Sequence, residues 1–368
     1  MLNIHILNVG NGDSIVIEHI DNDENVSFGL IDSNIDKGTS PPALEKLKEL
    51  GAKELSFISL THPHWDHYTG LAEIFEYYKG KIDTFYSFPV TSYLPGRLSG
   101  IAKTYKKLIR EAGTERKKRQ FKEFVEIIVL ATKHAKNWEE PTGFMTPIAP
   151  AGFNNVQFYV LLPSAKARGK YDKMVKSGKN DIAHVNNNSL NQLSMAFCLK
   201  YRGNEIVLAG DGAQVCWNEH IIKCSSTRNE ISSNAVKLPH HGSNNDNTEK
   251  ILNHFYAKTD EKYAVLSANG NKHPHPSTLR RLKNMKIDPY CTNLSSICQQ
   301  TLVTNREILD EIEPKLRNSI INNLTNHHTT TPCQGDVKVS IDDSGVMDIS
   351  SQTGNACPFR GSFDFLAD

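Results

Sequence analysis

The sequence predicts an α/β layered fold, in which strands and helices alternate along the chain. Short apolar runs with the composition of β-strands are followed by helical-looking stretches, and this alternation is typical of helices packed on sheets. Several apolar runs are also followed within three residues by histidine or aspartate, as at residues 55–60, 205–208 and 235–238. We expect the polar residues at these strand ends to meet in one site.

Length, charge and cysteine content exclude several classes of protein. The chain of 368 residues is long enough for one large domain or two modest ones. Its 42 basic and 41 acidic side chains give a net charge near zero, so any binding of a polyanion must be local. No apolar run approaches the ~20 residues of a membrane span, and the start does not resemble a signal peptide. Seven cysteines, an odd number, argue for a reducing compartment. We therefore expect a soluble cytoplasmic protein without a membrane partner.

The first elements are a hairpin and a further strand. Residues 4–9 and 15–18 are β-type runs joined by a glycine-rich turn, which predicts a hairpin or a bulged ribbon. Gly10 and Gly12 in this turn allow the backbone to approach closely whatever lies above it. A third strand is predicted over residues 28–33.

Two aspartates in this region are candidates for supporting roles. Asp32 lies at the end of the third strand, and Asp13 lies in the glycine-rich turn. Both are also explained by simple turn capping. A helix is then predicted to start at Pro41-Pro42 and to run through Leu50, because proline is tolerated in a first helical turn and Gly51 follows as a stop.

The strand predicted over residues 55–60 leads into a loop of potential metal ligands. His62, His64, Asp66 and His67 lie within six residues, directly before a helical-looking stretch from Tyr68 to Tyr78. Imidazole and carboxylate groups packed this closely each need a partner, and a divalent cation satisfies them together. The pair His62 and His64 can converge on one ion, while Asp66 and His67 turn toward a second. The alternative is a set of surface histidines with Asp66 as a helix cap.

With this loop the chain resembles a metallo-β-lactamase-fold hydrolase. That family places His-x-His-x-Asp-His after a strand and completes its metal site with later aspartate and histidine residues. The resemblance implies a four-layer αβ/βα sandwich, one domain over residues 1–368, and two divalent metal ions, zinc or manganese. It also implies that Asp211, near the end of the strand predicted over residues 205–212, bridges both ions. A turn-forming Asp-Gly pair explains the same residues locally.

Three further motifs narrow the resemblance to the hydrolase domain of ComEC-type DNA-uptake proteins and their stand-alone relatives. Residues 8–14, Asn-Val-Gly-Asn-Gly-Asp-Ser, are similar to that family's Asp-Val-Gly-Gln-Gly-Asp-Ser, with Asn8 and Asn11 as the departures. Residues 239–243 match its Pro-His-His-Gly-Ser, and residues 273–276 resemble its His-Pro-His-Pro.

The resemblance implies roles for individual residues. We expect one of the two adjacent histidines, His240 by preference, to face the metals, and the other to pack or to bind phosphate. His275 is expected either to cap the helix predicted over residues 277–286, for which Ser277 is the expected N-cap, or to contact substrate. The expected metal ligands are His62, His64, Asp66, His67, Asp211, His240 and His273, with His184 as a further candidate. The expected catalytic residues are Asp66, Asp211, His240 and His241, the expected substrate contacts are Asn188, Ser189, Ser243 and His275, and Asp13 and Asp32 are expected behind the ligands.

Two parts of the chain are expected to vary around this core. Residues 91–180 are predicted to be a partly helical, basic insertion, with helices over 101–110 and 115–130 and a later basic loop. Basic side chains beside a metal site would steer and hold a phosphate backbone. The alternative is a solvated helix face and a mobile loop. Residues 320–368 are predicted to form a polar linker followed by a hairpin.

These observations favour a metal-dependent hydrolase. The first hypothesis is a phosphodiesterase or nuclease that uses a metal-bound hydroxide on DNA or a nucleotide substrate. The second is a metallo-hydrolase of a small ester, lactone, thioester or amide, since one fold supports many reactions. The third is a non-catalytic subunit, in which the insertion binds a protein partner.

Overall fold

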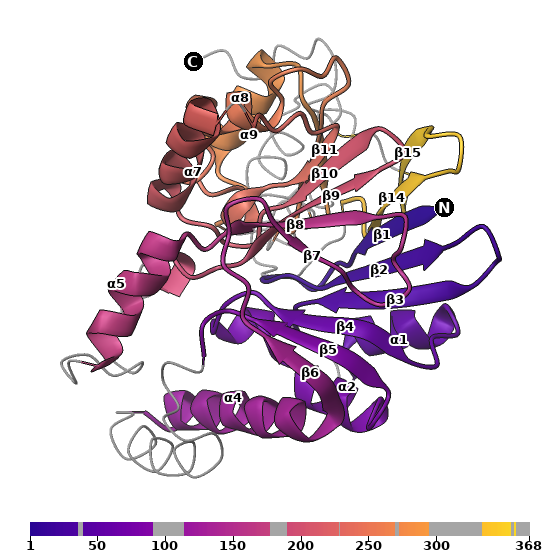
Figure 1. The fold of residues 1–368 in the computed structure, drawn as a ribbon. Coiled ribbons are helices and arrows are strands. Elements are labelled where there is room, and N and C mark those ends of the chain that lie inside the picture. The colour runs from indigo at the N-terminus through magenta and orange to yellow at the C-terminus, as the bar shows by residue number, and fades with distance from the viewer. Residues whose placement is uncertain are drawn as a thin grey trace, which may run out of the picture.

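The computed structural model describes residues 1–35, 40–90, 114–176, 190–227, 229–268, 272–293, 333–354 and 357. Within these residues two β-sheets pack against each other, and helices cover their outer faces (Figure 1). The predicted α/β sandwich is therefore confirmed. None of the helices described is both long and apolar enough to cross a membrane.

The first sheet has the strand order β15-β14-β1-β2-β3-β4-β5-β6. The predicted N-terminal hairpin is the antiparallel pair β1 and β2, and the predicted C-terminal hairpin joins the same sheet through β14. From β3 to β6 the strands are parallel. The strands are β1 (Leu2–Ile6), β2 (Ile15–Ile20), β3 (Val26–Ile31), β4 (Leu55–Leu60), β5 (Ile82–Ser87), β6 (Ala135–Glu139), β14 (Val337–Ile341) and β15 (Met347–Ser351).

The second sheet has the order β13-β12-β11-β10-β9-β8-β7. Its strands are antiparallel from β7 to β10 and parallel from β10 to β13. The strands are β7 (Thr146–Ile148), β8 (Gln157–Leu162), β9 (Ala196–Tyr201), β10 (Asn204–Leu208), β11 (Ala235–Lys237), β12 (Tyr263–Leu266) and β13 (Asp288–Cys291). Each sheet thus has a parallel half, whose loops follow the strands at the same edge.

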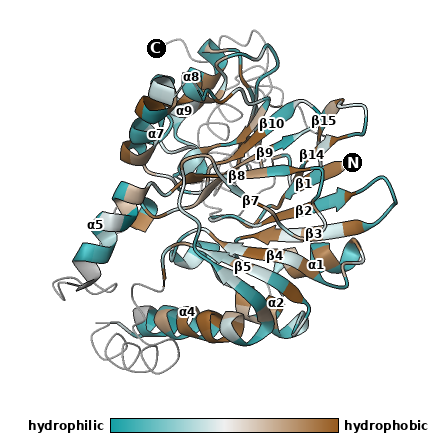
Figure 2. Ribbon diagram, in the orientation of Figure 1, coloured by the Kyte–Doolittle hydropathy of each residue, from teal (hydrophilic) through white to brown (hydrophobic). Residues whose placement is uncertain are grey.

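Alternation along the strands divides the apolar side chains between two layers. In β10, Ile206 and Leu208 belong to the core shared by the two sheets, whereas Val207 points to the opposite face. There Val207 belongs to a second core with Trp217 and Leu252, which come from the helices over the second sheet. This period of two is what a strand that is buried on both faces requires. Figure 2 shows apolar residues along the central strands.

Helices cover both sheets. Helix α1 contacts β2 and α4 contacts β6, with α2 packed on α4, while α7 contacts β8 and α9 contacts β13, with α8 packed on α7. In Figure 1, α5 projects away from the sheets. The helices are α1 (Pro42–Glu49), α2 (Leu71–Tyr77), α4 (Glu115–His134), α5 (Ala165–Lys176), α7 (Gln214–Thr227), α8 (Glu249–Phe255) and α9 (Pro276–Asn284).

The range 91–180, expected as a partly helical insertion, also contains strands of both sheets. The helix predicted at 115–130 is present as α4, but the residues after it supply β6 to the first sheet and β7 and β8 to the second. Residues 135–162 are therefore integral to both sheets. The later basic stretch, expected as a loop, forms helix α5. The helix expected at 101–110 and the linker expected at 320–332 lie outside the described residues.

Candidate metal centre

The candidate site lies where parallel strands of both sheets end. The loop after β4 carries His62, His64, Asp66 and His67, and the loop after β10 carries Asp211. The loop after β11 carries the two adjacent histidines 240 and 241. Ligand sites commonly form at the carboxyl ends of parallel strands, because loops from neighbouring strands meet there.

Asp211 lies between two groups of histidines. Its Oδ2 lies 3.5 Å from His67 Nε2 and 3.8 Å from His62 Nε2. Its Oδ1 lies 3.3 Å from His241 Nε2. His62 Nε2 in turn lies 2.8 Å from His64 Nδ1. In two groups of three side chains, the potential ligand atoms all lie within 4.8 Å of one another. These groups are His62 with His67 and Asp211, and Asp66 with His67 and His241. This arrangement suits a carboxylate shared by two ions.

We expected His240, rather than its neighbour His241, to face the metals, but His241 lies closer to Asp211. His241 is buried and lies close to Asp211, whereas His240 is partly exposed and its Nε2 lies 3.9 Å from Asp211 Oδ2. Both residues have left-handed backbones, with φ angles of 48° and 53°. This conformation is unfavourable for side chains with a Cβ. It directs the two imidazoles to different partners, which the sequence alone does not reveal.

Asp32 and Thr61 form hydrogen bonds with the loop that carries His62, His64, Asp66 and His67, called here the histidine loop. Asp32 is fully buried, and its Oδ2 accepts a hydrogen bond from His67 Nδ1 at 2.7 Å. The backbone N–H and the hydroxyl of Thr61 donate to the same carboxylate at 2.8 and 2.6 Å. Thr61 Oγ1 also lies 3.0 Å from His62 Nδ1. Since the Nδ1 atoms of both histidines are engaged, their Nε2 atoms are left to face Asp211.

Asp13 takes part in a buried ion pair with Lys237, a residue that the sequence reading did not single out. The side chains of both are almost completely buried, and Lys237 Nζ contacts Asp13 Oδ2. The same Nζ donates to the carbonyl of Gly210 at 3.2 Å, next to Asp211. The other oxygen of Asp13 lies 3.5 Å from His241 Nδ1. The pair therefore joins the turn after β1 to the second sheet, behind the candidate ligands.

The glycine-rich turn lies directly against the histidine loop. Gly12 has a φ of 104°, and a Cβ atom at this position would overlap the carbonyl oxygen of Asp66. Next to it, Asn11 Nδ2 donates a hydrogen bond to Asp66 Oδ2. The predicted close approach of the backbone at this turn is therefore seen in the structure. Asn8, where the ComEC-type motif has aspartate, accepts a hydrogen bond from Asn293 Nδ2 at 2.6 Å.

The pKa is raised for two of the buried histidines and lowered for a third. Burial opposes the charged form of His67, yet Asp211 and Asp32 raise its pKa well above the usual value. Burial likewise opposes protonation of His241, yet Asp211 and Asp13 raise its pKa to about 9. Burial lowers the pKa of His62 well below its usual value. The carboxylates therefore offset the burial of two of the three rings.

Several buried atoms of this cluster make no well-directed hydrogen bond, although Asp211 lies within ion-pair distance of His67 and His241. They are His64 Nε2, His67 Nε2, His241 Nε2 and Asp211 Oδ1. Buried polar atoms without partners are costly, and their convergence on a small volume fits the binding of divalent cations. Imidazole nitrogens favour zinc, and the mixed nitrogen and oxygen set also suits manganese. The residues present thus fit the metal ions that the sequence reading expected.

A cleft of about 570 Å³ opens beside His240. Here Asp246 Oδ2 accepts hydrogen bonds from His240 Nδ1 at 2.7 Å and from Ser243 Oγ at 2.6 Å. The sequence did not single out Asp246, because it follows three polar residues and looks like part of a turn. Its contact with His240 engages one ring nitrogen and leaves Nε2 on the side of Asp211. His273 also lines this cleft, with its ring centroid 5.4 Å from that of His240.

Of four further expected residues, the structure describes only His275. His275, which also lines the cleft, is the N-cap of α9, and its Nδ1 accepts a hydrogen bond from the backbone N–H of Ser277 at 3.1 Å. The expectation that Ser277 caps this helix is therefore wrong, because Pro276 already begins the helix. His184, Asn188 and Ser189 lie outside the residues that the structure describes.

Comparisons with known proteins agree with the sequence motif. Residues 7–86, which contain Asp13, Asp32 and the histidine loop, match the family model described as Metallo-beta-lactamase superfamily. No curated protein sequence matches the chain significantly. The ComEC-type resemblance, which rests on the finer motifs, stays a prediction.

Among solved structures the similarities are distant. The CmlA beta-hydroxylase has 8% identity and a TM-score of 0.43, over 80% of this chain and 52% of that one, so the chain spans about half of its length. Zn²⁺-bound PqqB from Methylobacterium extorquens has 10% identity and a TM-score of 0.39, over 79% and 98%. A diphosphatase from the PhnP family has 11% identity and a TM-score of 0.34, over 80% and 87%. The segment that carries the histidine loop is thus the part of the chain that matches the metallo-β-lactamase superfamily.

Proposed function

We propose that the protein is a divalent-metal-dependent hydrolase that cleaves phosphodiester bonds in a nucleic acid or a nucleotide. The observation that carries this proposal is the convergence on Asp211 of buried histidine and aspartate atoms that make no well-directed hydrogen bond. The family match of the segment that contains the histidine loop supports a hydrolase of the metallo-β-lactamase superfamily.

The ligand set divides around Asp211. His62 and His64 would hold one ion with Asp211, and Asp66, His67 and His241 approach the second position. When bound, the ions would lower the pKa of a water molecule to ~7 and neutralise charge on phosphate oxygens. Asp32 keeps His67 in the tautomer whose Nε2 is free to bind, because it accepts the hydrogen bond from Nδ1.

His240 and Asp246 form a pair that is suited to proton transfer. Asp246 accepts a hydrogen bond from Nδ1 of His240, and Ser243 donates to the same oxygen and steadies it. This contact orients the imidazole so that Nε2 faces the side of Asp211. His240 is also partly exposed at the cleft, so it can exchange protons with solvent. In its protonated form it could donate a proton to the leaving oxygen of a phosphodiester.

The basic side chains of helix α4 support the proposal that the substrate is a polyanion. Its first turns lie against the histidine loop: the guanidinium of Arg116 lies 5.8 Å from the ring centroid of Trp65, and the hydroxyl of Tyr68 donates to the carbonyl of Gln120 at 3.0 Å. Trp65 Nε1 also donates to Glu123 at 3.3 Å. The basic residues of these turns whose side chains the structure describes are Arg116, Lys118, Arg119 and Lys122. Such a group beside a metal centre would attract and position a phosphate backbone.

Cleavage assays with metal-loaded protein test the proposal. Zinc- or manganese-loaded protein is expected to cleave plasmid or single-stranded DNA, or a phosphodiester such as bis(p-nitrophenyl) phosphate. Asp211→Ala and Asp66→Ala should abolish cleavage, because each removes a carboxylate from the ligand set. Asp348→Ala, an exposed aspartate on β15, is the matched control and should retain cleavage.

The same samples distinguish the alternatives. Intact DNA and an intact phosphodiester with fully metal-loaded protein would refute the proposal. Hydrolysis of p-nitrophenyl acetate but not of the phosphodiester would favour a small-ester hydrolase. Less than one bound ion per chain in elemental analysis would favour a non-catalytic role.

A further inference from the structure

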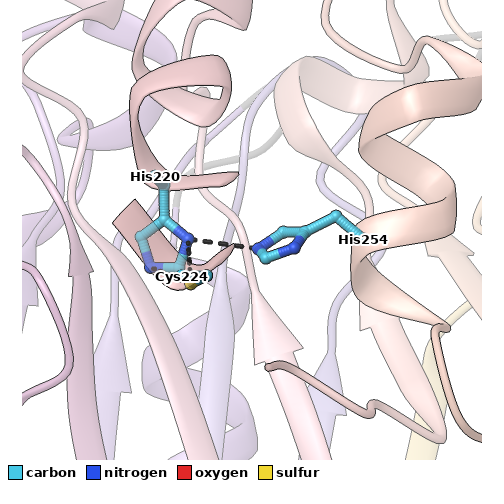
Figure 3. A group of neighbouring side chains, drawn as sticks. All are labelled: His220, Cys224 and His254. Carbon is cyan, nitrogen blue, oxygen red and sulfur yellow. Dashed lines mark hydrogen bonds between the residues drawn. The ribbon is translucent and has the colours of Figure 1, made fainter. Parts of the chain in front are cut away.

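A second group of metal-binding side chains lies away from the candidate metal centre, between two helices on the outer face of the second sheet. His220 and Cys224 are one turn apart on α7, and His254 comes from α8 (Figure 3). His220 Nδ1 lies 3.1 Å from His254 Nε2 and 3.3 Å from Cys224 Sγ. One ligand atom from each residue lies within 4.8 Å of the other two. The i, i+4 spacing on α7 places both of its side chains toward α8.

Hydrogen bonding alone does not satisfy this group well. His220 Nδ1 faces two neighbours, as the two dashed lines in Figure 3 show. An imidazole nitrogen carries either one proton or one lone pair, so it can make only one well-directed hydrogen bond. A cation at the point where the three atoms converge would instead accept a lone pair from each of them.

Two aromatic rings pack against the cluster. The ring of Phe144 lies 5.1 Å from that of His220, and the Trp217 ring lies 5.8 Å from it on the same helix. Burial lowers the pKa of His220 to about 3 and that of His254 to about 4. Burial also raises the pKa of the Cys224 thiol to about 11, so an ion must displace that proton when it binds. His254 is only partly buried, which gives an ion a way in from solvent.

We propose that His220, Cys224 and His254 form a second metal site that takes Zn²⁺ with two imidazoles and one thiolate. Zn–N bonds of about 2.0–2.1 Å and Zn–S bonds of about 2.3 Å place tetrahedral ligands ~3.3 Å apart for two nitrogens and ~3.6 Å for nitrogen and sulfur. The observed separations of 3.1 and 3.3 Å need little adjustment. Binding displaces the thiol proton of Cys224 to solvent, and water completes the four-coordinate site. The ion would join α7 to α8.

Cobalt substitution tests this site separately from the histidine–aspartate centre. The proposed ligands of that centre include no cysteine, so a thiolate-to-cobalt charge-transfer band reports on a cysteine site. Co²⁺-loaded wild-type protein should show the band, and Cys224→Ser should abolish it. The matched control is Cys216→Ser. Cys216 is buried on the same helix, but its thiol donates to the carbonyl of Gln192 at 3.4 Å, so this variant should keep the band.

Two further variants make the result independent of folding and of the proposed function. Asp211→Ala should keep the band, because this residue belongs to the other centre. His254→Gln changes a partly exposed side chain, and circular dichroism can confirm that it folds. In equilibrium dialysis against zinc, His254→Gln should bind one ion fewer than wild type. Absence of the band in the wild type, its persistence in Cys224→Ser, or an unchanged zinc content in His254→Gln would overturn the proposal.

Discussion

Replacing Lys237 by methionine should destabilise the protein strongly, because it breaks the buried ion pair with Asp13. Methionine fills similar volume but leaves the Asp13 carboxylate buried without its cation, and it also leaves the carbonyl of Gly210 without the hydrogen bond from Nζ. Removing one partner of a buried pair costs about 3–5 kcal/mol. We expect the free energy of unfolding to fall by about this amount.

The measurement is urea-induced unfolding in the presence of a chelator, so that metal binding does not contribute to stability. The double variant Lys237→Met with Asp13→Asn removes the charge that the single variant leaves buried. We expect it to be more stable than Lys237→Met by about 1–3 kcal/mol, since a neutral amide is less costly to bury than a carboxylate. A loss below about 1 kcal/mol in the single variant, or no recovery in the double variant, would refute the reasoning.

Three further tests address the turn, the helix cap and the basic helix. Gly12→Ala should destabilise the chelator-treated protein by clearly more than the ~1 kcal/mol expected for the control Gly203→Ala. Both positions have positive φ, but of the two only a Cβ at Gly12 would overlap a neighbouring carbonyl. Equal losses in the free energy of unfolding, measured with urea, would contradict this. His275→Ala should cost about 0.5–2 kcal/mol by removing the acceptor at the start of α9, whereas His275→Asn, which can still accept, should cost less. Charge reversal of Arg119 and Lys122 should weaken DNA binding and make the slope of log Kd against log salt shallower by up to ~2, and an unchanged slope would argue against contact with phosphate.

Elements with strong local signals could be predicted from the sequence. The strand at residues 55–60 and the helix from Pro42 are present within a residue of the predicted bounds, because an apolar run and a proline–glycine frame are local features. The strand at residues 158–163 was predicted and is present as β8, but β6 and β7 were not separated from the expected insertion. One of them, Thr146–Ile148, has only three residues and includes a proline, so it carries little pattern of its own.

The candidate site shows the same division. Spacing in the chain was enough to single out the histidine loop, whereas Asp211 was assigned from the family resemblance; their side chains lie together in the structure. The ion pair of Lys237 with Asp13 could not be predicted, because the two residues are 224 positions apart in the sequence and belong to different layers. The role of Asp246 depends on the backbone turn at His240, and nothing in a histidine pair indicates a left-handed conformation.

The two consecutive left-handed histidines imply a trade-off between folding and chemistry. Each such conformation costs about 1–2 kcal/mol for a residue with a Cβ, and glycine would remove that cost. A His241→Gly protein could therefore gain from a relaxed backbone while losing the ring that faces Asp211. Selection for a robust fold alone would favour glycine here, so the strain marks a position where the imidazole matters more than the energy of the main chain.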